Sequence, residues 1–117
     1  MNNNKCIFVI IILILFSSCT SVKEGKYTNY SYENIIKEKG KPNHDSIFIV
    51  NNDYFGYEIE PDYSLHFSTE ELKNGVQVRK LIWENILNYR LLIWLKLINE
   101  QWIVFDSVEY NSTFVVF

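Results

Sequence analysis

Residues 89–98 constrain the fold of this chain more than any other segment. The run Tyr-Arg-Leu-Leu-Ile-Trp-Leu-Lys-Leu-Ile contains only two charged residues, Arg90 and Lys96. As a strand, its odd positions from Leu91 form an apolar face and its even positions form a mixed face. As a helix, it is apolar almost all round, which suits only a buried helix. The Asn99–Glu100 pair and the β-rich residues 102–105 that follow favour a strand, as the first arm of a hairpin. A helix is the alternative.

Capping signals predict two short helices. Ser31 can cap a helix over residues 31–40, and Gly40 and Pro42 end it. Residues 68–71, Ser-Thr-Glu-Glu, match a capping box and predict a turn or two of helix that Asn74 and Gly75 stop.

The other segments are rich in strand formers. They are residues 46–50 and 54–60 as a hairpin around the turn at 51–53, residues 63–67 with Tyr63, Leu65 and Phe67 on one face, and residues 76–83 and 113–117. The sequence therefore predicts an α+β fold, with one or two short helices packed on an antiparallel sheet of about five or six strands. We expect one domain over residues 30–117.

The N-terminus carries the pattern of a secretory signal. A polar start with Lys5 precedes an unbroken apolar run over residues 6–16, followed by Ser17, Ser18 and Cys19. As a helix that run spans about 17 Å, shorter than the hydrocarbon core of about 30 Å. The segment is therefore predicted to be a cleaved signal and not a retained membrane span.

The end of this signal resembles the lipobox of bacterial lipoproteins, because an apolar residue and two small ones, Phe16-Ser17-Ser18, precede Cys19. The resemblance implies that residues 1–18 are a signal peptide and that Cys19 carries fatty acids such as palmitate. We expect residues 19–29, which are mostly polar, to form a lipidated tether. The chain would then be anchored in the bacterial cell envelope, with the outer membrane favoured over the inner one. Cys6 would be removed with the signal.

The order of lipobox, polar segment, short helix and strands is similar to that of the SmpA/OmlA family of small outer-membrane lipoproteins. The residues that carry this resemblance are Ile35-Ile36, Gly40-Lys41-Pro42, residues 54–57 (Tyr-Phe-Gly-Tyr), residues 65–67 (Leu-His-Phe) and Gly75-Val76. The resemblance implies an α+β fold and a role in envelope assembly.

The sequence offers little for catalysis. The two histidines, His44 and His66, lack the spacing of a metal site, and no cysteine remains after lipidation of Cys19. Nucleotide-binding and serine-hydrolase motifs are absent from the sequence. We therefore expect neither an enzyme nor a bound cofactor or metal. A hydrolase that uses His66 with a nearby carboxylate is an alternative.

Aromatic residues are abundant, at 16% of the chain. Two interpretations stand: they fill the core of a small sheet, or they form an exposed patch that binds a partner. The partner-binding candidates are Trp83, Trp94, Trp102, Tyr54 and Tyr57. The formal net charge of −3 gives no reason to expect nucleic acid as a partner. A non-catalytic protein-binding or structural role in the envelope is thus predicted. The alternative is an inhibitor or immunity-type lipoprotein, whose acidic charge would suit a basic toxin or enzyme.

Overall fold

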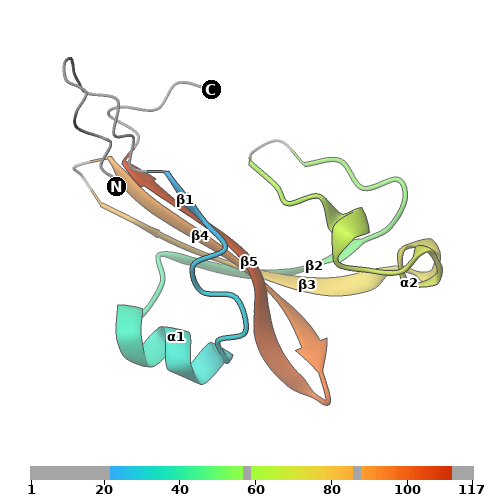
Figure 1. Cartoon of the computed structure of the whole chain (residues 1–117), viewed down its shortest axis with the longest axis horizontal. Coiled ribbons are helices and arrows are strands. Elements are labelled where there is room, and N and C mark those ends of the chain that lie inside the picture. The colour runs from blue at the N-terminus through green and yellow to red at the C-terminus, as the bar shows by residue number, and fades with distance from the viewer. Residues whose placement is uncertain (1–21, 57–58, 86–87, 112–117) are drawn as a thin grey trace, which may run out of the picture.

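The segment over residues 89–98 is a strand at the centre of the sheet. The computed structural model describes residues 22–56, 59–85 and 88–111. Within them, five antiparallel strands are arranged in the order β1-β5-β4-β3-β2, and β4 is the segment in question (Figure 1). The described part also contains two short α-helices, so the predicted α+β fold is confirmed. The bounds are β1 Lys23–Glu24, α1 Tyr32–Lys39, β2 His44–Val50, α2 Thr69–Asn74, β3 Val76–Glu84, β4 Tyr89–Ile98 and β5 Gln101–Asn111.

The predicted hairpin between β4 and β5 is present. Ile98 pairs with Gln101, and the two residues between them have positive φ angles, 52° at Asn99 and 66° at Glu100. Positive φ at both central residues is the mark of a type I′ turn, whose twist matches that of the strands it joins. The hairpin therefore closes with the shortest connection that antiparallel strands allow.

Both helices have the caps that the sequence predicts. The Ser31 side chain accepts a hydrogen bond from the Asn34 amide, and the Gly40 amide donates to the Ile36 carbonyl at 2.7 Å with φ at +80°. In α2, Ser68 and Glu71 form both bonds of a capping box, at 3.1 and 2.8 Å. These local bonds explain why two helices too short to be stable alone begin and end where they do.

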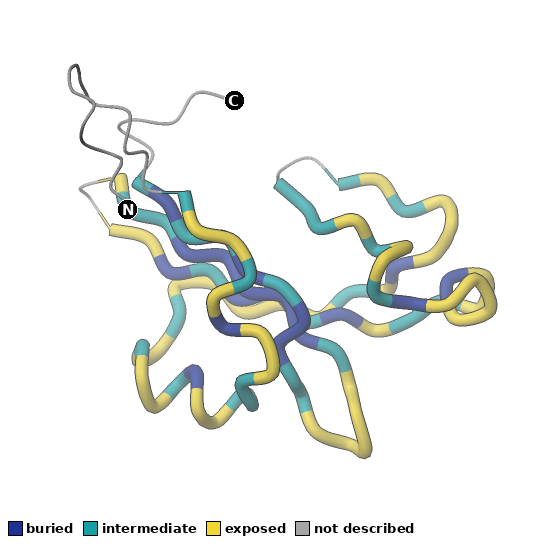
Figure 2. Tube along the Cα trace, in the orientation of Figure 1, coloured by how far each residue is buried: buried dark blue, intermediate teal, exposed yellow. Residues whose placement is uncertain are grey.

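Each face of the sheet is covered by a different part of the chain (Figures 1 and 2). On the first face, α1 and the segment before it pack through Ile35 and Tyr27 against Leu91, Ile93 and Leu95. On the second face, residues from the β2–β3 connection pack against a separate cluster that includes Leu92, Trp94 and Phe105. Leu91 to Leu95 are all fully buried, so β4 is apolar on both sides because both sides are covered.

The connection between β2 and β3 corrects part of the prediction. Val50 pairs directly with Val76, so residues 51–75 leave the sheet and return to the same place. The described residues of the expected strand at 54–60 are not in a strand, and residues 63–65 of the expected strand at 63–67 form a 3-10 helix capped by Asp62. Accordingly, β2 forms its hairpin with β3 across this long connection and not with residues 54–60.

This connection folds over the second face through aromatic contacts. Tyr54 stacks on Phe48 with ring centroids 5.5 Å apart and meets Tyr63 edge-on at 5.7 Å. Phe67 reaches Phe105 of β5 at 5.3 Å. The aromatic residues that suggested strands are therefore core residues of an irregular segment. Leu65, expected on the same face as Tyr63 and Phe67, is instead 77% exposed.

The predicted tether over residues 19–29 is also corrected where the structure describes it. Lys23 and Glu24 pair with Glu109 and Val108 as β1, and the amides of Gly25 and Asn29 donate to the carbonyls of Ser107 and Val104, both at 2.9 Å. Tyr27 is buried against the first face. The folded domain therefore begins by residue 23, and its early residues complete one core. The predicted strand at 113–117 lies outside the described residues.

Candidate protein-binding surface

The tryptophans proposed for partner binding do not form one patch. Trp83 and Trp102 lie on the first face of the sheet, whereas Trp94 and Tyr54 lie on the second. Trp94 is fully buried, and Trp83 is buried with its indole N–H donating to the Gly40 carbonyl at 3.2 Å. These two tryptophans are core residues, which corrects the expectation that they contact a partner.

Trp102 and Tyr54 are half-buried, and Tyr57 lies outside the described residues. Tyr54 is held between Phe48 and Tyr63 and thus belongs to the cover of the second face. Of the proposed residues that the structure describes, Trp102 alone borders an exposed apolar region.

That region lies on the first face, next to the N-terminal end of α1. Ile47 and Ile49 of β2 are 51% and 53% exposed, and Leu97 of β4 is 45% exposed. Ile47 pairs with Arg79 and Ile49 with Gln77, while Leu97 lies one position beyond the Val78–Lys96 pair, next to Gln77. The alternation of side chains puts all of them on the same side of the sheet. We refer to Ile47, Ile49 and Leu97 as the distal surface.

Arg79 forms the boundary between the distal surface and α1. Its guanidinium donates two hydrogen bonds of 2.8 Å to the carboxylate of Asp45 and lies 4.1 Å from the ring centre of Tyr32. The ring centre of Trp102 is 5.7 Å from the same guanidinium. The hydrogen bond with Asp45 raises the pKa of Arg79 above its ordinary value. This fixed cation, with two aromatic rings, gives the distal surface a polar and aromatic rim.

The distal surface also adjoins an edge of the sheet. β2 is the last strand in the order, and all seven of its residues pair with β3 on one side only. No strand within the described residues covers its other side. An edge strand presents backbone N–H and C=O groups that can pair with another chain. Both apolar side chains and hydrogen-bonding groups are thus available along β2.

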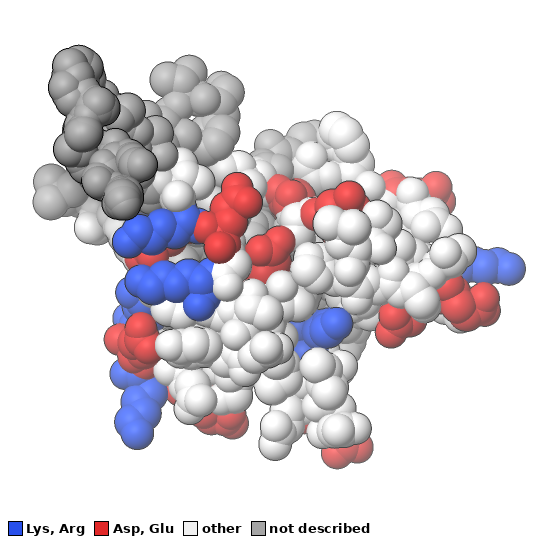
Figure 3. Space-filling view, viewed as in Figure 1, with Lys and Arg blue, Asp and Glu red and all other residues white. Residues whose placement is uncertain are grey.

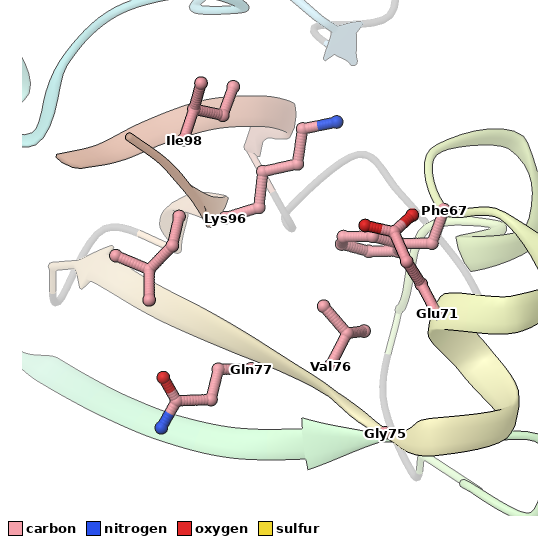
Figure 4. A pocket seen from close by; sticks show the side chains of 8 residues that line it. Phe67, Glu71, Gly75, Val76, Gln77, Lys96 and Ile98 are labelled. Atoms are coloured by element: carbon pink, nitrogen blue, oxygen red, sulfur yellow. The ribbon is translucent and has the colours of Figure 1, made fainter. Parts of the chain in front are cut away.

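A groove lies at the same end of the sheet, and its lining includes Gln77 and Leu97 of the first face (Figure 4). Its volume is about 320 Å³, and its apolar lining includes Phe67, Val76 and Ile98. Lys96 and Glu71 enter it from different walls. The Lys96 ammonium donates to the His66 carbonyl at 3.3 Å, which ties β4 to the connection over the second face.

The two histidines sit beside carboxylates without forming a tight catalytic pair. Nε2 of His66 is 3.8 Å from Oδ2 of Asp106, longer than the 2.6–3.2 Å at which a general base shares a proton. The His66 ring lies against Phe105, with centroids 4.8 Å apart. His44 bonds to Glu84 at 3.3 Å on the open surface. In the part of the chain that the structure describes, no group of three or more His, Cys, Asp or Glu side chains could hold a metal ion.

Sequence reasoning missed the distal surface because it depends on neighbours that are distant in sequence. Ile47 and Ile49 look like core residues of a strand, and only the position of β2 at the edge of the sheet leaves them exposed. The alternation in β2 places Ser46 and Phe48 on one face and Ile47 and Ile49 on the other. It does not show which of these faces other parts of the chain cover.

Comparison with known proteins gives no family for this chain. No family model, no curated protein and no solved structure matches it. The resemblances to lipoproteins and to the SmpA/OmlA family stay predictions from the sequence. Among the described residues, no helix has the length and apolar character needed to cross a membrane.

Proposed function

We propose that this chain is a small lipid-anchored protein of the bacterial envelope that binds another protein through its distal surface. The observation that carries the proposal is the exposure of Ile47, Ile49 and Leu97 on one side of the sheet, beside an uncovered edge strand. Exposed aliphatic side chains gathered at one place are typical of interaction sites, whereas single ones are not.

The geometry favours a partner that adds a strand to β2. The seven residues of β2 extend over about 23 Å, enough for several backbone hydrogen bonds to an added strand. Ile47 and Ile49 would then contact alternate side chains of that strand. Trp102 and Arg79 stand at the rim, and both residue types often contribute strongly to binding energy. Backbone pairing would supply affinity, and the aliphatic side chains would supply specificity.

The anchor in this proposal comes from the sequence. The lipobox pattern before Cys19 supports lipidation, and a protein held at a membrane needs only a modest interface to keep a neighbouring envelope protein close. The role that follows is non-catalytic: the domain presents one end of its sheet to a partner while its lipid fixes the location.

The test compares capture by matched variants of the lipidated full chain. Ile47→Glu places a carboxylate opposite Arg79, so the folded state should survive while the distal surface becomes charged. Leu65→Glu makes the same change at an apolar residue that is more exposed and lies outside that surface. After cross-linking in intact cells, we expect a specific envelope protein to be recovered with the wild type and with Leu65→Glu, and to be lost with Ile47→Glu. Equal recovery by both variants would contradict the proposal.

An inhibitor or immunity-type role is the second candidate, and the charge distribution favours it. Residues 44–75 contain seven acidic residues and one basic residue, Lys73. Acidic side chains gather over this part of the molecule in Figure 3. A basic toxin bound there would dissociate as salt is raised, because exposed charges are screened. A partner on the distal surface would stay bound at high salt, so the salt dependence of capture without cross-linking separates the two candidates.

A further inference from the structure

We propose that the domain lies directly on an anionic lipid surface through three lysines at the end opposite the distal surface. These residues are Lys23, Lys26 and Lys39, which we call the basic edge. The inference rests on the lipid anchor of the proposed function. It assigns the orientation of the anchored domain and the chemistry of the membrane it meets.

Only a short length of chain separates the predicted lipid on Cys19 from the first strand. Cys19 is four residues before Lys23, and an extended chain covers at most about 3.6 Å per residue, so their Cα atoms are within about 14 Å. Lys23 itself is paired with Glu109 in the sheet. An anchored Cys19 therefore holds β1 close to the headgroups, within about two Debye lengths at physiological salt. No long flexible tether separates the domain from the membrane.

The basic edge places lysine side chains next to β1. The ammonium groups of Lys26 and Lys39 are 3.7 and 3.9 Å from the Glu109 carboxylate, and both lie 5.3 Å from the ring centre of Tyr27. Lys23 and Glu109 line one shared depression. Two lysines thus pair with the Glu109 carboxylate and a third, Lys23, is its neighbour on β1. The same carboxylate accepts a hydrogen bond from the Tyr89 hydroxyl at 2.6 Å. Residues 22–41 contain five lysines and three glutamates, so this part of the chain carries a small positive excess even with Glu109 included. Figure 3 shows blue side chains along the edge of the molecule near α1, with red ones among them.

Negative charge is concentrated in another part of the molecule. The acidic excess of residues 44–75 lies over the connection and α2, away from the basic edge (Figure 3). A negatively charged surface attracts one end of such a molecule and repels the other. The charges therefore favour a single orientation on anionic lipid, with the basic edge toward the headgroups.

This orientation leaves the distal surface free. Tyr89, which bonds to Glu109 beside the basic edge, is the first residue of β4, and Leu97 is eight residues along the same strand. At about 3.3 Å per residue they are roughly 26 Å apart. Docking through the basic edge would therefore point the end of the β4–β5 hairpin away from the membrane.

The test uses the mature lipidated chain in phosphatidylcholine vesicles with or without about one-third phosphatidylglycerol. Lysines are modified with a membrane-impermeant amine reagent, and rates are read residue by residue by mass spectrometry. At about 0.01 M salt we expect anionic vesicles to slow modification of Lys23, Lys26 and Lys39 several-fold while Lys73 is unaffected. At about 1 M salt, where the Debye length is about 3 Å, the difference should disappear.

A variant provides the second readout. A dye on Glu100→Cys at the hairpin tip, with acceptor dyes in the lipid, should show low energy transfer on anionic vesicles. Replacing all three lysines of the basic edge with glutamine should raise that transfer, because the tip is no longer held away. Equal protection of all lysines, together with unchanged transfer, would overturn the proposal. Absence of lipid on Cys19 would instead be seen as failure to float with the vesicles, and would remove the proposed function as well.

Discussion

Replacement of Trp94 by alanine tests whether the second face of the sheet is covered. Trp94 is fully buried on that face, among Phe67, Phe105 and Val78, and the Lys80 ammonium lies 5.5 Å from its ring centre. The cover comes from residues 51–75, a connection in which sequence patterns placed residues 54–60 and 63–67 in strands. If the connection were not packed there, Trp94 would face solvent.

The magnitude follows from the buried area. A tryptophan buries up to about 250 Å², which at about 25 cal/mol per Å² gives an upper limit of about 6 kcal/mol. Because alanine keeps part of that burial and the site relaxes, we expect Trp94→Ala to lower the free energy of unfolding by about 3–5 kcal/mol. The free energy of unfolding of a domain of this size is about 5–15 kcal/mol in total. The variant should therefore lose at least about a fifth of its stability, a loss that urea unfolding resolves.

The assay is urea unfolding of the chain from Thr20, followed by far-ultraviolet circular dichroism so that the lost tryptophan does not alter the signal. The slope of unfolding free energy against urea concentration should stay near the wild-type value, so that the two free energies can be compared. Leu65→Ala, at an exposed site of the same connection, serves as control and should stay within about 0.5 kcal/mol. A loss below about 1 kcal/mol for Trp94→Ala would refute the packing of residues 51–75 on this face.

Three other predictions concern the anchor, the turn and two half-buried tyrosines. Cys19→Ala should abolish labelling by a fatty-acid analogue while Cys6→Ala keeps it, and label that persists in Cys19→Ala would remove the lipoprotein assignment. Glu100→Gly should raise the free energy of unfolding by about 0.5–1 kcal/mol in urea titrations, because glycine adopts the positive φ of this turn without strain; a loss would contradict the type I′ turn. Burial and hydrogen bonds to Glu60 and Glu109 raise the pKa of Tyr63 and of Tyr89. Their contribution to stability is complete below about pH 10 and declines above it, since the unfolded tyrosines then ionise, and Tyr63→Phe should make the decline in unfolding experiments shallower.

Local signals predicted much of the fold. Ser31, Gly40 and the Ser68–Glu71 pair fix helix ends through bonds between residues three or four apart, so the sequence contains the whole signal. The β4–β5 hairpin depends on the Asn99–Glu100 turn and was predicted for the same reason.

Long-range packing accounts for what the sequence did not predict. Residues 54–60 are rich in strand formers, yet Tyr54 stacks on Phe48 instead of joining a strand, because the Val50–Val76 pair closes the β2–β3 hairpin without this segment. Trp94 and Trp102 are both tryptophans in strand-forming segments. Trp94 is buried and Trp102 borders an exposed surface because different parts of the chain cover the two faces of the sheet. The candidate site was therefore not visible from the sequence, apart from Trp102.

Site-specific photo-cross-linking in intact cells identifies what contacts the distal surface. A photoreactive phenylalanine analogue is placed at Ile49 of the distal surface in the full lipidated chain, and at Leu65 as the control position outside it. We predict one discrete adduct with an envelope protein from position 49 and none from position 65. Adducts from position 65 alone, or the same adduct from both positions, would contradict the assignment of the distal surface as the binding site.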